Sequence, residues 1–406
     1  MSKSIPYNFL LTSLIKTNLI WAVVAPIVLA FFTMIISNSA VFILKDAFFY
    51  FSFSLLFLLP NRFFNVKNKL RPIIFILLFL LFIILITFVF HDFHVWQVYN
   101  IRQLLAPIMI VSFVAYLKTN VEFTQKIIIY IINLVLWLII IGGIFSVINI
   151  WNFFDLTNFF NSKGIPTYSD GTPAMFYEPA MNYCPRLVST ILDPISFGHI
   201  ITSAIVSLYF LKSISIKRRK TYLFILLLGL ILTFSKGAIF QMILCLTLLN
   251  SRSNIFFRIL IPITVLVLGY FFIDLKGVII HFKGLYFAFK NINWFGHGLG
   301  MVGNYAKMFA TDLTIYKKMQ ISDTFIGSVI GQIGILGFCF WGLYFMRYFL
   351  DIFKKVLMPG SLIIVSQLII SILSENTLNF TSFFIPGILS VLVNKYRLYE
   401  YRNNRH

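Results

Sequence analysis

Three cations stand at the ends of apolar runs, where a charged side chain is costly. Arg102 precedes QLLAPIMIVSF, Arg186 precedes LVSTILDPISF, and Lys236 lies between two apolar arms. An ionisable group at the edge of a membrane span costs about 2.5 to 3.5 kcal/mol on insertion scales, so it needs a partner, a cavity or an anion. Three such cations at the ends of separate helices would make a site for a diphosphate. The alternative is that each one snorkels to the headgroup level of a bilayer.

Carboxylates and histidines near the ends of apolar runs are candidates for proton transfer. Asp323 stands directly before a glycine-rich apolar run, His297 lies in GHGLG, and Glu178 lies in a segment rich in Gly, Pro and Tyr. His281 and Asp193 complete the set. Two of these residues also have a structural interpretation. Asp323, in SDT, is suited to cap a helix, and for His297 an exposed turn histidine is the interpretation that we favour.

The stretch DPISFGHI, which follows Arg186, predicts the start of a helix. Proline suits the first helical turn and aspartate its cap, which fits Pro194 and Asp193. His199 lies one turn further in, and we expect it to be a hydrogen-bonded core residue. Arg186 is therefore the residue of this region that we expect to do chemistry, and the helix start orients it.

The composition is that of an integral membrane protein. The chain has 406 residues, of which 59% are hydrophobic and only 11% are charged, and its mean hydropathy is +0.91. A soluble domain has about 25% charged residues. The apolar runs are continuous rather than alternating and long enough to cross a bilayer, which predicts an all-α protein with membrane-spanning helices and not a barrel. We expect the first run to stay in the protein because no signal-peptide cleavage site follows it.

The cysteines and the charge exclude several other classes of site. Cys184, Cys245 and Cys339 show no CxxC spacing, so neither a disulfide framework nor a zinc site is expected. HDFH, residues 91–94, is interpreted as an outer-face loop rather than a metal site. The net charge is +20, but the basic residues are scattered between apolar runs, which argues against nucleic acid as a partner and for membrane topology. We predict no metal and no cofactor.

The apolar runs predict a polytopic protein with about twelve spans, near residues 18–36, 43–60, 73–90, 103–117, 127–150, 194–211, 221–234, 237–250, 259–273, 324–346, 361–374 and 380–394. With both termini in the cytoplasm, every segment on the inner side is basic, as the positive-inside rule asks. The region 221–250 is interpreted as a hairpin that turns at the outer side through Ser235–Gly237. One long helix with Lys236 inside it is the alternative.

Two outer loops, residues 151–193 and 274–323, are long, and long loops on a rigid scaffold often carry substrate contacts. The second begins with a segment in which Lys276, Lys283 and Lys290 recur every seven residues, which places them on one face of a helix. That helix could lie on anionic lipid or contact a substrate. No repeat or linker divides the chain, so we expect one membrane domain over residues 1–406.

Several short motifs, in this order along residues 100–342, resemble those of one family. They are NIRQLLAP, RLVSTILDP, LTFSKGA, NWFGHGLG and ISDTFIGSVIGQIGILGFCFW. Together they resemble the O-antigen and capsule polysaccharide polymerases of the Wzy type, which share a superfamily with the O-antigen ligases. Two positions depart from the superfamily's patterns. Lys236 stands where arginine is usual, so the charge is kept but the bidentate contact of a guanidinium with phosphate oxygens is lost. Ser322 and Asp323 stand where ligases place a histidine.

The resemblance implies a GT-C-like glycosyltransferase in the bacterial inner membrane, with its active site facing the periplasm. Its substrates would be polyprenyl-diphosphate-linked oligosaccharides, and it would use no metal or nucleotide sugar. By resemblance, Arg102, Arg186 and Lys236 would hold the diphosphate. Asp323 would rank first as general base because the family pattern places the following span beside the site. A chain-length regulator and a flippase are the protein partners that the resemblance implies.

Two other classes of protein stay open. A ligase would transfer the same donor glycan to the lipid A core, although the chain lacks the ligase histidine before the late span. A flippase or another secondary transporter for lipid-linked oligosaccharides would also be polytopic and basic. Such a transporter should show internal repeats and charges that line a central cavity rather than two long outer loops.

Overall fold

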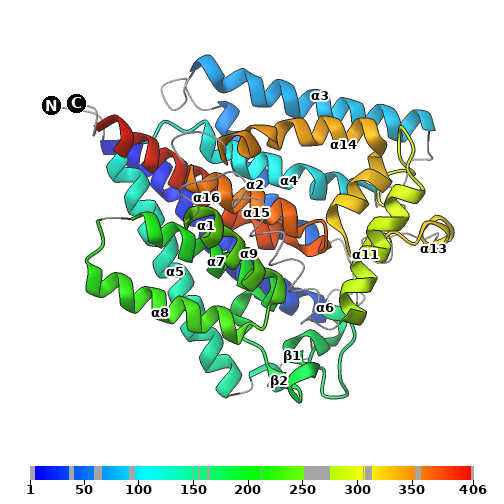
Figure 1. Ribbon diagram of the computed structural model, residues 1–406, viewed down its shortest axis with the longest axis horizontal. Coiled ribbons are helices and arrows are strands. Elements are labelled where there is room, and N and C mark those ends of the chain that lie inside the picture. The colour runs from blue at the N-terminus through cyan, green and yellow to red at the C-terminus, as the bar shows by residue number, and fades with distance from the viewer. Residues whose placement is uncertain are drawn as a thin grey trace. The chain divides into compact units, whose positions relative to one another are not determined.

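The computed structural model describes residues 5–35, 41–58, 66–90, 97–148, 150–153, 156–161, 165–211, 213–250, 275–304, 306, 313–352 and 358–403. These residues form the helices and the short strand pair shown in Figure 1. They group into two compact units, each discontinuous in sequence. Unit 1 comprises residues 1–69, 110–239 and 381–406, and unit 2 comprises residues 70–109 and 240–380. The expectation of one membrane domain stays a prediction.

Unit 1 holds the N-terminal helices, the loop segment near residues 150–193 and the C-terminal helix. Its elements are α1 (Ile5–Ile35), α2 (Val41–Leu58), α5 (Val121–Val147), η3 (Ile150–Phe153), α6 (Thr157–Asn161), η4 (Ala174–Phe176), β1 (Tyr177–Glu178), η5 (Pro179–Met181), β2 (Cys184–Pro185), η6 (Ser189–Ile191), α7 (Pro194–Phe210), α8 (Ile216–Leu232) and most of α16 (Phe380–Asn403). Strands β1 and β2 pair antiparallel, with Glu178 opposite Cys184.

Unit 2 holds α11 (Leu275–Lys290), α13 (Thr314–Met319), α14 (Phe325–Ile352), α15 (Pro359–Ile370) and η7 (Glu375–Leu378). Besides α16, three helices continue from one unit into the other in sequence: α3 (Val66–Phe90), α4 (Val98–Ala115) and α9 (Lys236–Asn250). The predicted span 259–273 and the HDFH segment lie outside the described residues.

The protein is an all-α membrane protein, as its composition predicts. Among the described residues, Leu11–Phe32, Val121–Val147 and Phe325–Ile352 are long and apolar enough to cross a bilayer, and several shorter apolar helices accompany them. Helix α5 is apolar on both sides: Ile131 and Val135 are buried, whereas Trp137 and Ile144 are exposed. A helix with an apolar outer face suits lipid contact. The count of twelve spans stays a prediction.

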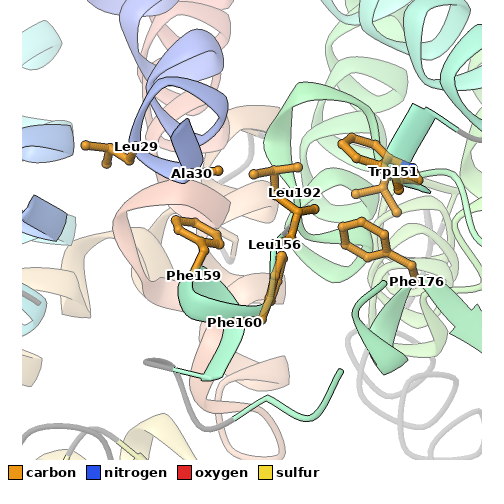
Figure 2. Close-up of a cluster of buried hydrophobic side chains, with 9 residues drawn as sticks. Leu29, Ala30, Trp151, Leu156, Phe159, Phe160, Phe176 and Leu192 are labelled. Atoms are coloured by element: carbon orange, nitrogen blue, oxygen red, sulfur yellow. The ribbon is translucent and has the colours of Figure 1, made fainter. Parts of the chain in front are cut away.

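The core of unit 1 beside the loop segment is aromatic. Leu29 and Ala30 of α1 belong to the same buried cluster as Trp151, Phe160 and Phe176, as Figure 2 shows. The Phe176 ring lies 5.1 Å from that of Trp151 and 5.4 Å from that of Phe160, centroid to centroid, with edge-on geometry. Such pairs add about 0.5 to 1.5 kcal/mol beyond the burial of their area. This cluster therefore fixes the segment that leads into β1.

Two predicted helix boundaries are present in unit 1. Asp193 caps α7, because its Oδ1 accepts the backbone N–H of Ile195 at 2.9 Å, and Pro194 occupies the first turn. His199 is buried in α7, as expected of a core residue. Helix α8 ends at Leu232, and Phe234 has a φ of +48° before α9 begins at Lys236. The region 221–250 is therefore two helices and not one.

Helix α14 is broken at Gly334, whose φ is +68°. The NWFGHGLG segment bonds to the backbone around this break. His297 and Gly298 donate to the carbonyls of Gly331 and Gln332, and the N–H groups of Ile335 and Leu336 donate to Asn293 and Trp294. Backbone groups freed inside an apolar helix must find such partners. Two motifs separated by 34 to 42 residues thus form one structural feature.

Candidate functional site

Arg186 follows β2 and is bonded to the end of α8. Its Nε donates to the carbonyl of Thr233 at 2.9 Å, its Nη2 to that of Phe234 at 3.4 Å, and its Nη1 to that of Met175 at 3.5 Å. A guanidinium has five N–H donors, so two remain for a ligand. A cation at the C-terminus of a helix is also favoured by the helix dipole. Arg186 therefore has a structural contact in addition to any contact with substrate.

Lys236 and Arg186 face the same carboxylate. The Nζ of Lys236 lies 3.7 Å from Oε1 of Glu178, and the Lys236 side chain is 50% exposed whereas that of Glu178 is 12% exposed. Burial lowers the pKa of Arg186, and the charges of Glu178 and Asp193 oppose that effect. Unit 1 thus brings together two predicted diphosphate ligands and one predicted catalytic acid. Glu178 is the ion-pair partner of Lys236, and its charge also acts on Arg186.

Small residues hold this cation pair in place. A Cβ on Gly198 of α7 would lie 2.7 Å from Cβ of Ala238 and 2.9 Å from Cβ of Ser235, so only glycine lets α7 approach the turn that carries Lys236. Thr202 strengthens the contact by donating to the carbonyl of Ala238 at 3.0 Å. The position of Lys236 is therefore fixed by side chains of α7.

An apolar cavity of about 220 Å³ lies in unit 1 beside this region. Its lining includes Ile27, Phe145, Trp151 and Leu192. Trp151 packs on Phe176, visible in Figure 2, and the carbonyl of Phe176 accepts the backbone N–H of Arg186 at 2.7 Å. One wall of the cavity is thus connected through Phe176 to the arginine.

The remaining predicted cations lie in unit 2. Arg102 is in the second turn of α4, so the three-cation clamp stays a prediction. Lys276, Lys283 and Lys290 all lie in α11, and the side chain of Lys276 is outside the described residues. Lys283 and Lys290 are exposed, and their Nζ atoms lie 5.8 and 5.9 Å from the centre of the Phe287 ring. Both positions suit a lipid surface as well as a substrate.

Asp323 lies in unit 2 with its backbone against α11. A Cβ on Gly284 would overlap the carbonyl oxygen of Ser322, and His281 donates from Nδ1 to the carbonyl of Asp323 at 3.0 Å. Helical geometry puts Lys283 and Lys290 on the opposite side of α11 from His281. The lysines therefore point away from this proton-transfer candidate.

The capping interpretation of Asp323 is wrong. Helix α14 begins at Phe325, and the hydroxyl of Thr324 accepts the N–H of Gly327 at 3.1 Å, so Thr324 caps the helix. Asp323 has a φ of +58°, and its Oδ1 accepts the side-chain amide of Asn304 at 2.9 Å. Its half-buried carboxylate is thus available for chemistry rather than used as a cap.

A second carboxyl group, which the sequence reasoning missed, completes this cluster. Glu375 of η7 is 2% exposed, and its Oε2 accepts the backbone N–H of Asn304 at 2.7 Å. Asn304 therefore links Glu375 to Asp323. Burial, with a smaller effect of the Asp323 charge, raises the pKa of Glu375 to about 8. Glu375 stands between the apolar runs 361–374 and 380–394, and the cost of an ionisable group there would have identified it.

His297 has a structural contact and is not an exposed turn residue. Its side chain is half-buried, and Nε2 donates to the carbonyl of Asn291 at 2.8 Å. This bond holds the NWFGHGLG segment closed beside the break in α14. No described contact joins His297 to Asp323 or to Glu375, so its predicted catalytic role gains no support from its surroundings.

No protein-family model and no curated protein matches this chain in sequence. The resemblance to polysaccharide polymerases therefore rests on the motifs and their order alone.

Proposed function

We propose that this chain is a membrane glycosyltransferase that polymerises polyprenyl-diphosphate-linked oligosaccharides, in the manner of O-antigen or capsule polymerases. The observation that carries the proposal is the pair of cations, Arg186 and Lys236, that share the charge of Glu178. Charge-assisted bonds to phosphate oxygens are among the strongest hydrogen bonds that a protein makes. The two remaining N–H donors of Arg186 and the half-exposed Lys236 could both bind such oxygens. The diphosphate would then replace Glu178 as the counter-ion of Lys236.

The proposed reaction needs positive charge beside the leaving diphosphate. When the growing glycan leaves its lipid, the bond between the anomeric carbon and a diphosphate oxygen breaks, and negative charge develops on the diphosphate. A fixed cation at that position acts on the transition state. One such donor is worth roughly 3 kcal/mol, on the order of a hundredfold in rate. The acceptor is a hydroxyl at the non-reducing end of a second lipid-linked repeat.

The apolar cavity of unit 1 supports a lipid-linked substrate. It is lined by Ile, Phe, Trp and Leu side chains, and Phe176 connects its wall to the backbone of Arg186. Apolar volume of this kind suits part of a polyprenyl chain whose diphosphate lies at the cations.

The proposed setting is the bacterial inner membrane. We infer about twelve spans on a GT-C-like scaffold, with both termini in the cytoplasm and the loops 151–193 and 274–323 in the periplasm. The lysine face of α11 would lie on anionic headgroups at the same surface. A flippase supplies the lipid-linked repeats in this proposal, and a chain-length regulator acts on the product.

The test is a reaction with purified protein in liposomes and polyprenyl-diphosphate-linked repeats. We expect a ladder of longer glycans that is lost in Arg186→Ala and kept in Arg218→Ala. Arg218 is a matched control because it is an exposed cation of α8 whose partner among the described residues is Tyr222 in the same helix. The fold of each variant is checked by its melting temperature. Movement of intact lipid-linked repeats across the bilayer without a ladder would overturn the proposal in favour of a transporter.

A further inference from the structure

Glu375 is a carboxyl group in unit 2 that has no role in the proposed binding of the diphosphate. Among the described residues, no lysine or arginine forms an ion pair with it. Its Oε2 has one partner, the N–H of Asn304, whereas Oε1 is buried without a hydrogen bond. An isolated buried carboxylate costs so much free energy that such a group takes up a proton instead.

The surroundings of Oε1 offer acceptors for that proton. A Cβ on Gly303 would lie 2.7 Å from Oε1 and 2.4 Å from Oγ of Ser328, so the two oxygens flank the same glycine. Ser328 and Gln103 both face the carboxyl group and lower its pKa slightly, but neither completes a hydrogen bond of normal geometry with Oε1. A proton on Oε1 would satisfy one of these oxygens. A buried Oε1 without a hydrogen bond thus favours the acid form of Glu375, which can donate to a neighbouring oxygen.

The other titratable groups around Glu375 do not compensate its charge. Asp323 is a second acid, and its negative charge favours a proton on Glu375. Tyr316 of α13 has its own pKa raised by burial and by the charges of both acids. Gln103 and Ser328 are neutral. The two carboxyl groups thus differ in environment: Glu375 is fully buried, and Asp323 is half exposed. Such pairs divide into one acid and one base.

We propose that Glu375, in its acid form, is a positioning residue that holds Asn304 and, through it, the Asp323 carboxylate as proton acceptor of the transfer reaction. The inference rests on the proposed function. In the step itself, the bond from the anomeric carbon to the diphosphate oxygen breaks and its electron pair leaves on the diphosphate. The bond to the acceptor oxygen forms, and the proton of that hydroxyl passes to Asp323. Glu375 keeps its own proton throughout.

The test compares Glu375→Gln with wild type over a range of pH. Glutamine keeps an acceptor for Asn304 and places an N–H donor toward Ser328, as the acid form does. We expect Glu375→Gln to polymerise at the wild-type rate at neutral pH. Wild type should lose activity as the pH rises through about 8, because Glu375 then ionises, and the variant should not. Tyr316→Phe, which removes the neighbouring phenol, should keep the wild-type fall.

Two further variants complete the comparison. Asp323→Asn should lower the rate by about a hundredfold or more, as expected for loss of a general base. Glu375→Ala should lower it by about a hundredfold because Asp323 is then misplaced. A loss of rate in Glu375→Gln at neutral pH, or an alkaline fall equal to that of wild type, would overturn the inference.

Infrared difference spectroscopy separates this inference from the proposed function. Wild type minus Glu375→Gln should show the carbonyl band of a protonated carboxyl group at neutral pH, whether or not the protein polymerises. Absence of the band would overturn the inference about Glu375 alone. Absence of a glycan ladder in wild type would instead overturn the proposed function.

Discussion

Lys236 is paired with Glu178, and Arg186 lies within the influence of the same charge, but the two cations differ in what else they hold. The guanidinium of Arg186 bonds to three backbone carbonyls, so a change there disturbs the end of α8 as well as any ligand. Within the part of the chain that the structure describes, the Lys236 side chain has the ion pair with Glu178 and no other partner, and half of it is exposed. An exposed ion pair contributes about 1 kcal/mol or less to stability. Lys236 is therefore the cation at which catalysis can be separated from folding.

Lys236→Met should lower the polymerisation rate by about tenfold or more while leaving the melting temperature near that of wild type. The physical reason is that the lysine charge stabilises the leaving diphosphate but contributes little to the fold. Lys236→Arg is the matched control. It keeps the charge and adds a bidentate fork, so its rate should equal or exceed that of wild type. Equal rates for wild type and Lys236→Met would show that this cation does not act on the reaction.

At the scale of elements, the break in α14 is the feature of unit 2 to which the NWFGHGLG segment bonds. The segment from Asn293 to Gly298 supplies hydrogen bonds that the helix loses at Gly334. A Cβ on Gly334 would lie 2.3 Å from the carbonyl oxygen of Trp294, and the φ of +68° is one that only glycine adopts readily. The half of α14 before the break carries Ser328 and follows Asp323. Its position, and hence the carboxyl pair, depends on this loop.

Gly334→Ala should destabilise the protein by about 1 to 3 kcal/mol, because the new methyl group clashes with the loop and the backbone is strained. Gly342→Ala in the same helix is the matched control. A Cβ there meets nothing within 4 Å, and alanine favours a helix by about 1 kcal/mol over glycine, so this variant should be at least as stable as wild type. Thermal unfolding in detergent measures both. Equal melting temperatures for the two variants would contradict the structural role of Gly334.

At the scale of the whole molecule, features that depend on local sequence could be predicted. Continuous apolar runs identified a helical membrane protein, and Asp193 with Pro194 identified the start of α7. The break between α8 and α9 at residues 233–235 followed from basic flanks on both sides. The apolar runs and the start of α7 are read within the element itself, and the basic flanks lie at the outer ends of the two helices that they separate.

Features that depend on distant residues could not be predicted. The bonds between NWFGHGLG and α14 join backbone groups 34 to 42 residues apart and leave no periodic pattern in the sequence. In SDT, three residue types can cap a helix, and only the fold shows that Thr324 does so and leaves Asp323 free. Glu375 lies in no recognisable motif, and only the fold brings it to Asn304 and Asp323. The contact of Arg186 with the end of α8 likewise needs tertiary structure.

The most direct test of the proposed function is the stoichiometry of the reaction. Purified protein in liposomes is given lipid-linked repeats, and free polyprenyl diphosphate and glycan length are measured in the same sample. Transfer at the anomeric carbon predicts one polyprenyl diphosphate released for each repeat added to the glycan, with both products lowered together in Lys236→Met. Release of polyprenyl diphosphate without longer glycans, or unchanged lipid-linked repeats, would contradict the proposal that this chain is a polymerase.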